Sequence, residues 1–193
     1  MIDFLKFDQD RPNASFYDII IYTAAIFVSS NLIFMILISL FGINANDSIE
    51  NEKNKEYDEW YKKNISVWSL IVSNMTNSSI YSPIAEEIVF RLVLLKYILV
   101  DKFKLNIYTS IIIQSLIFGS LHLSNITFTT QTKKYTYLQT FSAIITGIIS
   151  GWVFYHTNSL LPCIFSHIIN NTSASISEII GYIKYKREKS KIQ

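Results

Sequence analysis

Apolar residues along this chain are gathered into long runs. One run of about 25 residues covers positions 17–41, which is long enough to cross a bilayer with some tilt. No charged side chain occurs at 19–46, and between residues 105 and 183 the charged side chains are Lys133, Lys134 and Glu178. A helix of a soluble protein needs polar residues along its outer face, and these segments lack them. The pattern therefore predicts an integral membrane protein whose helices are surrounded by lipid.

Four more segments are expected to enter the bilayer, at residues 83–100, 107–123, 138–156 and 162–183. Ser82 and Pro83 suit the cap and the first turn of the helix over 83–100. Gly147 and Gly151 would let another helix approach the fourth span closely. Residues 65–80 mix apolar with amide and hydroxyl side chains, which indicates an interfacial or partly buried helix. The predicted fold class is an all-α polytopic membrane helix bundle of about five transmembrane helices, or six if residues 65–80 also cross, plus an interfacial helix.

The distribution of Lys and Arg predicts the orientation. With five spans, most of these residues lie on the side of the C-terminus, which the positive-inside rule assigns to the cytoplasm. We therefore expect a multi-pass protein of the cell membrane. Residues 1–64 would form an N-terminal transmembrane helix and hydrophilic loop, residues 65–183 the main helix bundle, and residues 184–193 a basic cytoplasmic tail. The abundance of Asn, Ile and Lys is typical of an AT-rich bacterium.

Composition excludes several classes of protein. The 193 residues are 50% hydrophobic and 17% charged, which is too apolar for a disordered chain. The net charge of +2 provides no basic surface for nucleic acid. The single cysteine, Cys163, forbids an internal disulfide, and it is interpreted as a small apolar residue rather than a nucleophile. The expected partner at this point is the lipid bilayer, whereas the sequence does not predict the oligomeric state.

A few ionisable side chains interrupt the apolar spans. Burying such a group costs about 2.5–3.5 kcal/mol on insertion scales, so each one is a candidate functional residue. Glu86, Glu87 and Arg91 lie in the second span, and Glu87 and Arg91 are four residues apart on one helix face, where they can pair. Glu86 is rotated by about 100° from Glu87 and would meet a different neighbour. As an alternative, the three residues could form an ion cluster that joins helices without any catalytic role.

Polar residues from two other spans complete the candidate site. His122 ends the third span, and His167 and Asn171 lie four residues apart in the fifth, where they could aim donors at one point or form an interhelical hydrogen-bond pair. A carboxylate base, a second group that holds water and two donors are what activation of water against a carbonyl requires. We therefore predict a hydrolase site in which Glu86, His122, His167 and Asn171 converge on one cavity in the inner half of the bilayer.

Three motifs follow one another along the chain: Glu86-Glu87-x-x-x-Arg91, Phe118-x-x-x-His122 and His167-x-x-x-Asn171. In order and spacing they resemble the motifs of the CPBP intramembrane proteases, a family also called Abi that includes CAAX prenyl endopeptidases and bacteriocin-processing enzymes. The resemblance covers about residues 80–175. It implies a CAAX-protease-like glutamic endopeptidase in which Glu86 is the general base and His122 holds the same water. His167 and Asn171 would then stabilise the oxyanion, and Glu87 and Arg91 would be structural or orienting.

The resemblance leaves open whether a metal takes part. The chain lacks the His-Glu-x-x-His helix of common zinc peptidases. Glu86, His122 and His167 would be an acceptable zinc ligand set in number and type. However, they come from three separate helices, and ligation at about 2 Å demands much tighter placement than hydrogen bonding does. We therefore expect a metal-free mechanism without a cofactor.

Two other functions are compatible with such a scaffold. One is a non-catalytic membrane protein that protects its producer from a bacteriocin, and the other is a proton-coupled carrier that uses Glu86 and His122. Five spans are few for a carrier, and the intact motif residues favour the enzyme. A bacterium does not ordinarily supply prenylation, so a bacteriocin leader, a pheromone precursor or a membrane regulator is the expected substrate.

Overall fold

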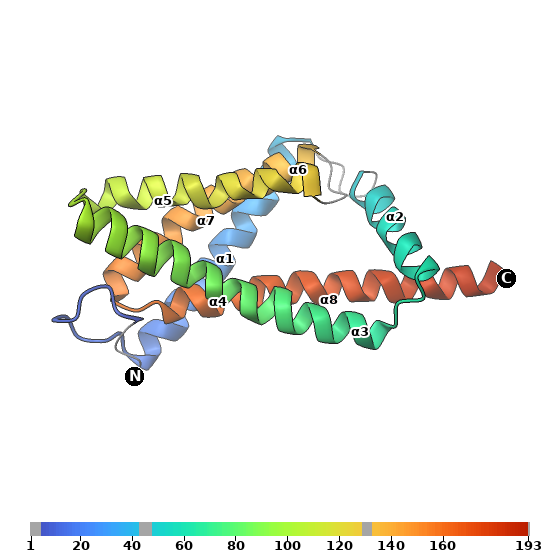
Figure 1. The fold of residues 1–193 in the computed structure, drawn as a ribbon, viewed down its shortest axis with the longest axis horizontal. Helices are drawn as coiled ribbons and strands as arrows, with labels where there is room; N and C mark the ends of the chain where they lie inside the picture. The colour runs from blue at the N-terminus through green and yellow to red at the C-terminus, as the bar shows by residue number, and fades with distance from the viewer. Residues whose placement is uncertain (1–4, 43–47, 129–132, 193) are drawn as a thin grey trace.

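The structure, a computed structural model, describes residues 5–42, 48–128 and 133–192, and these residues form helices and no strand. Figure 1 shows an elongated helical bundle. The elements in chain order are α1 (Phe16–Leu40), α2 (Ser48–Lys62), α3 (Val67–Ser73), η2 (Asn74–Tyr81), α4 (Ser82–Glu87), η3 (Ile88–Lys102), α5 (Ile107–Leu121), η4 (His122–Ser124), α6 (Asn125–Phe128), α7 (Lys133–Thr157) and α8 (Leu161–Ile192). The all-α prediction is confirmed.

Three helical stretches in the described part of the chain are long and apolar enough to cross a membrane. They are α1, α5 together with η4, and α7, with mean hydropathies of 2.2, 1.4 and 1.3. The segments 83–100 and 162–183 are also helical, as expected, but they do not meet the same criteria of length and apolar composition. A helical membrane bundle is therefore supported, and a total of five crossings stays a prediction.

One continuous helical rod runs from α3 through η2 and α4 to η3 (Figure 1). Its start is at Ser66, whose hydroxyl accepts the Ser69 N–H at 3.0 Å. The element α4 begins at Ser82 with Pro83 in its first turn, as expected, but it continues the rod from η2, so the prediction that Ser82 caps the start of a new helix is wrong. In η2 the hydrogen bonds span five residues, as in the bond from the Ser82 N–H to the Asn77 carbonyl. The next bond of that register would run from the N–H of Pro83 to the Ser78 carbonyl, but proline has no N–H. This one bond is therefore missing, and the helix continues through the proline.

Small residues hold α5 against α7. A side chain at Gly147 would meet Ser115 of α5 at 3.1 Å, and one at Gly151 would meet the Gln114 amide at 3.2 Å. The Gln114 amide donates to the Gly147 carbonyl at 3.1 Å across this contact. The close approach that Gly147 and Gly151 predicted is therefore present.

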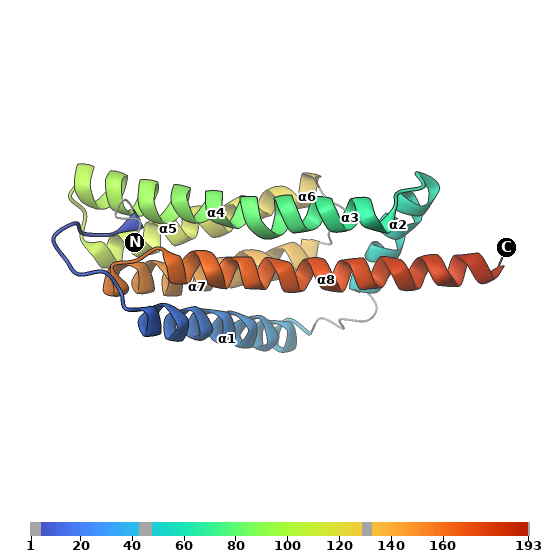
Figure 2. The same ribbon diagram turned by 90° about the horizontal axis from the view of Figure 1, so that it is seen from below.

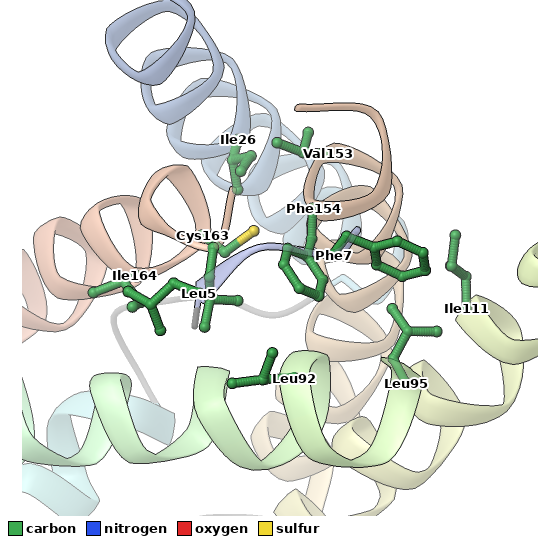
Figure 3. Close-up of a cluster of buried hydrophobic side chains, with 11 residues drawn as sticks. Leu5, Phe7, Ile26, Leu92, Leu95, Ile111, Val153, Phe154, Cys163 and Ile164 are labelled. Atoms are coloured by element: carbon green, nitrogen blue, oxygen red, sulfur yellow. The ribbon is translucent and has the colours of Figure 1, made fainter. Parts of the chain in front are cut away.

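A buried apolar cluster fills the end of the bundle where α7 turns into α8 (Figure 3). It includes Leu5, Phe7, Ile26, Leu92, Leu95, Ile111, Val153, Phe154, Leu160, Cys163 and Ile164. The N-terminal segment reaches this cluster because the Asn158 side chain, in the turn, bonds to both the N–H and the carbonyl of Asp8. Cys163 is buried there with its thiol on the Ser150 carbonyl, which agrees with a packing role.

The opposite end of α8 extends past the bundle and packs against α2 (Figure 2). Its 32 residues correspond to about 48 Å of helix, more than the roughly 30 Å hydrocarbon core. Tyr57 of α2 and Tyr182 of α8 are buried in this contact. Nearby, the Lys62 ammonium and the Tyr185 hydroxyl donate hydrogen bonds to the Asp58 carboxylate. These bonds, the one from Lys62 most strongly, lower the pKa of the Asp58 carboxyl from 3.8 to about 2.

Candidate active site

An ion pair lies at the centre of the candidate site. Glu87 ends α4 and Arg91 lies one turn later in η3, with Arg91 Nε at 3.1 Å from Glu87 Oε2. Their side chains are 2% and 1% exposed, so water screens neither charge. The geometry is that of a close ion pair rather than an aligned hydrogen bond. The pair that the four-residue spacing predicted is therefore present, and its burial makes it a fixed part of the fold.

His167 of α8 binds to the same glutamate. Its Nδ1 lies 2.9 Å from Glu87 Oε1. A carboxylate paired with arginine can only accept, so Nδ1 must carry the proton in this contact. Nε2 then points away from Glu87, toward Glu86 Oε2 at 3.8 Å. Glu87 thus orients the His167 ring, as outer carboxylates do for functional histidines elsewhere.

Glu86 occupies the adjacent face of α4 and stays partly exposed, with 32% of its side chain accessible. The Ser82 hydroxyl, one turn earlier, donates to Glu86 Oε1 at 2.7 Å. The other oxygen, Oε2, is the one that faces His167. The two neighbouring glutamates therefore differ in environment: Glu87 is sealed in an ion pair, whereas Glu86 keeps one oxygen available to water.

The Phe118 ring of α5 forms a wall behind these groups. The Arg91 guanidinium carbon lies 4.5 Å from the ring centroid, which is cation–π geometry. The rings of His122 and His167 meet Phe118 edge-on, with centroids 5.6 and 6.3 Å away. One aromatic side chain therefore contacts residues of all three motifs and limits how they can move.

His122 and Asn171 lie on two sides of this group. His122 follows the last turn of α5 and interacts electrostatically with Glu86 and His167. The Asn171 amide nitrogen donates to the Ser78 carbonyl at 2.9 Å. That carbonyl is the one whose register partner would be Pro83, which has no N–H to offer. Asn171 thereby joins α8 to η2, and the amide keeps a second N–H for another acceptor.

A cavity of about 290 Å³ connects most of the candidate residues. His122, His167, Asn171, Glu87 and Arg91 are among the residues that line it, whereas Glu86 is not. Glu86 meets the group through its 3.8 Å approach to His167. The expected convergence therefore holds for three of the four residues, and Glu86 stands beside the cavity rather than in its wall.

The residues do not form a metal-binding cluster. Among residues 5–42, 48–128 and 133–192, no group of three or more His, Cys, Asp or Glu side chains is placed to hold a metal ion. The contact of His167 Nδ1 with Glu87 leaves Nε2 free for another partner, and the metal-free mechanism stays a prediction.

The cavity also contains residues that the sequence did not single out. They lie on α1, α7 and α8 and are uncharged and polar, and they include Asn31, Gln139, Ser142, Thr146 and Asn170. A signal was present in the sequence, because Gln139, Ser142 and Thr146 repeat at helical spacing within an apolar span. Polar residues at such positions are typical of substrate pathways in membrane proteins.

Comparison with known proteins identifies the family. The family model described as type II CAAX prenyl endopeptidase Rce1-like matches residues 66–173, which is more than half of the chain and contains all three motifs. No curated protein and no solved structure matches the chain. The matched region includes all the candidate site residues, which are Glu86, Glu87, Arg91, His122, His167 and Asn171. The chain therefore belongs to the Rce1-like type II CAAX prenyl endopeptidase family.

Proposed function

We propose that this protein is an intramembrane endopeptidase that hydrolyses a peptide bond of a membrane-associated protein or peptide with a water activated by Glu86. The observation that carries the proposal is the position of His167, which Glu87 holds at 2.9 Å while its other nitrogen faces the partly exposed Glu86. A cluster that served only to lock helices would have no need of a second, accessible carboxylate beside an oriented histidine.

In the proposed reaction, Oε2 of Glu86 takes a proton from water as the water oxygen attacks the substrate carbonyl carbon. Oε1 is held by Ser82, so the carboxylate presents one defined oxygen. His122, which lines the cavity, holds the same water. After the C–N bond breaks, the protonated Glu86 returns its proton to the leaving amine, and the products are a carboxyl and an amino terminus.

His167 and Asn171 stabilise the oxyanion in this scheme. Because Nδ1 of His167 is committed to Glu87, Nε2 can donate only when the ring carries both protons. The imidazolium balances the charges of Glu86, Glu87 and Arg91, since the four groups then sum to zero. Asn171 contributes the N–H that the Ser78 carbonyl does not use.

The proposed setting is the cell membrane of a bacterium, with several crossings and a cytoplasmic C-terminus. The name of the matched family refers to prenylated substrates. For this chain we propose an unprenylated substrate, such as a leader peptide or a membrane regulator.

The test compares the peptides released by cells that express the wild type, Glu86→Gln or Glu59→Gln. Glu59 is a suitable control because it is an exposed glutamate of α2, 63% accessible, outside the site. We expect a released peptide with the wild type and with Glu59→Gln, and none with Glu86→Gln. An identical set of peptides from all three would refute the proposal. Protection against a bacteriocin that persists in Glu86→Gln would favour the immunity protein instead.

A further inference from the structure

The part of the cavity lining that comes from α1, α7 and α8 contains uncharged polar side chains among apolar ones such as Phe34, Ala143 and Ala174. On α7 the residues Gln139, Ser142, Thr146 and Ser150 follow one another three or four positions apart, so they form one stripe along the helix. This stripe lies in a helix apolar enough to span a membrane. Polar groups there cost free energy unless something hydrogen-bonds them.

Several polar groups of this wall have unused hydrogen-bonding capacity. In the described part of the chain, the hydroxyls of Ser142 and Thr146 make no hydrogen bond. Asn31 of α1 donates to the Asn170 side-chain carbonyl at 3.0 Å, which leaves the Asn170 amide and the Asn31 carbonyl for other partners. The wall thus offers both donors and acceptors.

Charge is absent from this wall. Among the described residues that line the cavity, the charged groups of the proposed scheme are Glu87, Arg91 and His167, and both Arg91 and His167 pair with Glu87, at 3.1 and 2.9 Å. A charged substrate side chain would enter without a counter-ion, and burying it would be costly. A long isoprenoid chain would contact the apolar lining but would leave the hydroxyls and amides of the stripe without hydrogen bonds, which is unfavourable.

We infer that the α1–α7–α8 wall of the cavity is a binding site for the main chain of an uncharged, unprenylated peptide segment. A peptide main chain presents alternating N–H donors and carbonyl acceptors, which matches hydroxyl and amide groups that both donate and accept. The volume of about 290 Å³ is at the lower end for ligand pockets, so a short segment fits. The inference rests on the proposed function, because the same cavity contains His122 and His167 and would bring the bound carbonyl to them.

A protection experiment tests this site without requiring catalysis. Ala143 lines the cavity and contributes no polar group, and Ala25 of α1 is exposed and does not line it. Each is changed to cysteine in a Cys163→Ser, Glu86→Gln background, and its modification by a maleimide is timed in the purified full chain. The probes are acetylated, amidated hexapeptides of Ala, Ser, Thr, Asn and Gln, the same peptides with one Asp or Lys, and farnesyl cysteine methyl ester.

We expect the uncharged peptides to slow modification of Ala143→Cys and not of Ala25→Cys, and the other probes to have no effect. Adding Ser142→Ala and Thr146→Val should raise the half-protecting concentration about tenfold, since two hydrogen bonds are lost. Ser29→Ala is the matched control, because that hydroxyl bonds within α1 and is outside the cavity.

Protection by the farnesyl ester alone, or by no probe, would overturn the inference. Equal protection by the uncharged peptides in the parent and in the Ser142→Ala, Thr146→Val variant would also overturn it, provided that the two proteins have the same melting temperature. Protection without hydrolysis by the Glu86-containing chain would refute the proposed function and leave the binding site standing. Hydrolysis without protection would refute the binding site and leave the proposed function standing.

Discussion

Removing the positive charge of Arg91 should destabilise the whole bundle. Arg91 and Glu87 are 1% and 2% exposed, and Arg91→Met would leave the Glu87 carboxylate buried without its cation. Breaking a buried pair from one side costs about 3–5 kcal/mol. For a chain of this length about 1 kcal/mol lowers Tm by roughly 2–4 °C, so we expect Tm to fall by about 6–20 °C.

The assay is thermal unfolding of the purified protein in detergent, with two comparisons. Lys63→Met breaks an ion pair of the same four-residue spacing that is exposed on both sides, and it should shift Tm by about 2 °C or less. Glu87→Gln combined with Arg91→Met removes both charges and should regain much of the loss. Wild-type stability of Arg91→Met, or a double variant that melts below it, would refute the account of this pair.

Three further outcomes are expected. The pKa of Asp58 is lowered to about 2, so its ionised form should stabilise the α2–α8 contact above pH 4, and this contribution should be lost as the pH falls through about 2. Trp60 fluorescence should report the loss, and Asp58→Asn should abolish the pH step. Peptidase activity should survive EDTA, with substoichiometric zinc by elemental analysis; stoichiometric metal and activity restored by zinc would contradict the metal-free scheme. Asn171→Asp cannot donate a hydrogen bond to the Ser78 carbonyl and should lower kcat, whereas Asn171→Gln keeps the amide donor and should retain more activity. Equal activity of the two variants would contradict a role for this hydrogen bond in catalysis.

The sequence predicted the features that depend on local spacing. Glu87 and Arg91 pair because residues four apart share a helix face, and the small residues Gly147 and Gly151 allow close packing in any bundle. The all-helical class follows from the long apolar runs. These predictions needed no knowledge of how one helix is rotated against another.

Features that depend on the relative rotation of helices could not be predicted in this way. The sequence did not indicate that Glu87 would orient His167, and it placed Glu86 in the cavity, whereas the packing of α8 on α4 puts Nδ1 of His167 on Glu87 and leaves Glu86 outside the cavity wall. The cap expected at Ser82 is wrong because the helical backbone of η2, with its five-residue hydrogen-bond register, continues into α4. The same register frees the Ser78 carbonyl for Asn171, a contact that no spacing rule indicates.

The measurement that tests the central claim most directly is cleavage of an identified peptide by the purified protein in lipid nanodiscs. Glu86→Gln should reduce kcat by about 10²–10⁴-fold, the usual contribution of a general base, with an unchanged melting temperature. Glu59→Gln, a glutamate remote from the site, should cleave like the wild type. Cleavage by Glu86→Gln within a few-fold of the wild-type rate would contradict a mechanism in which Glu86 activates the water.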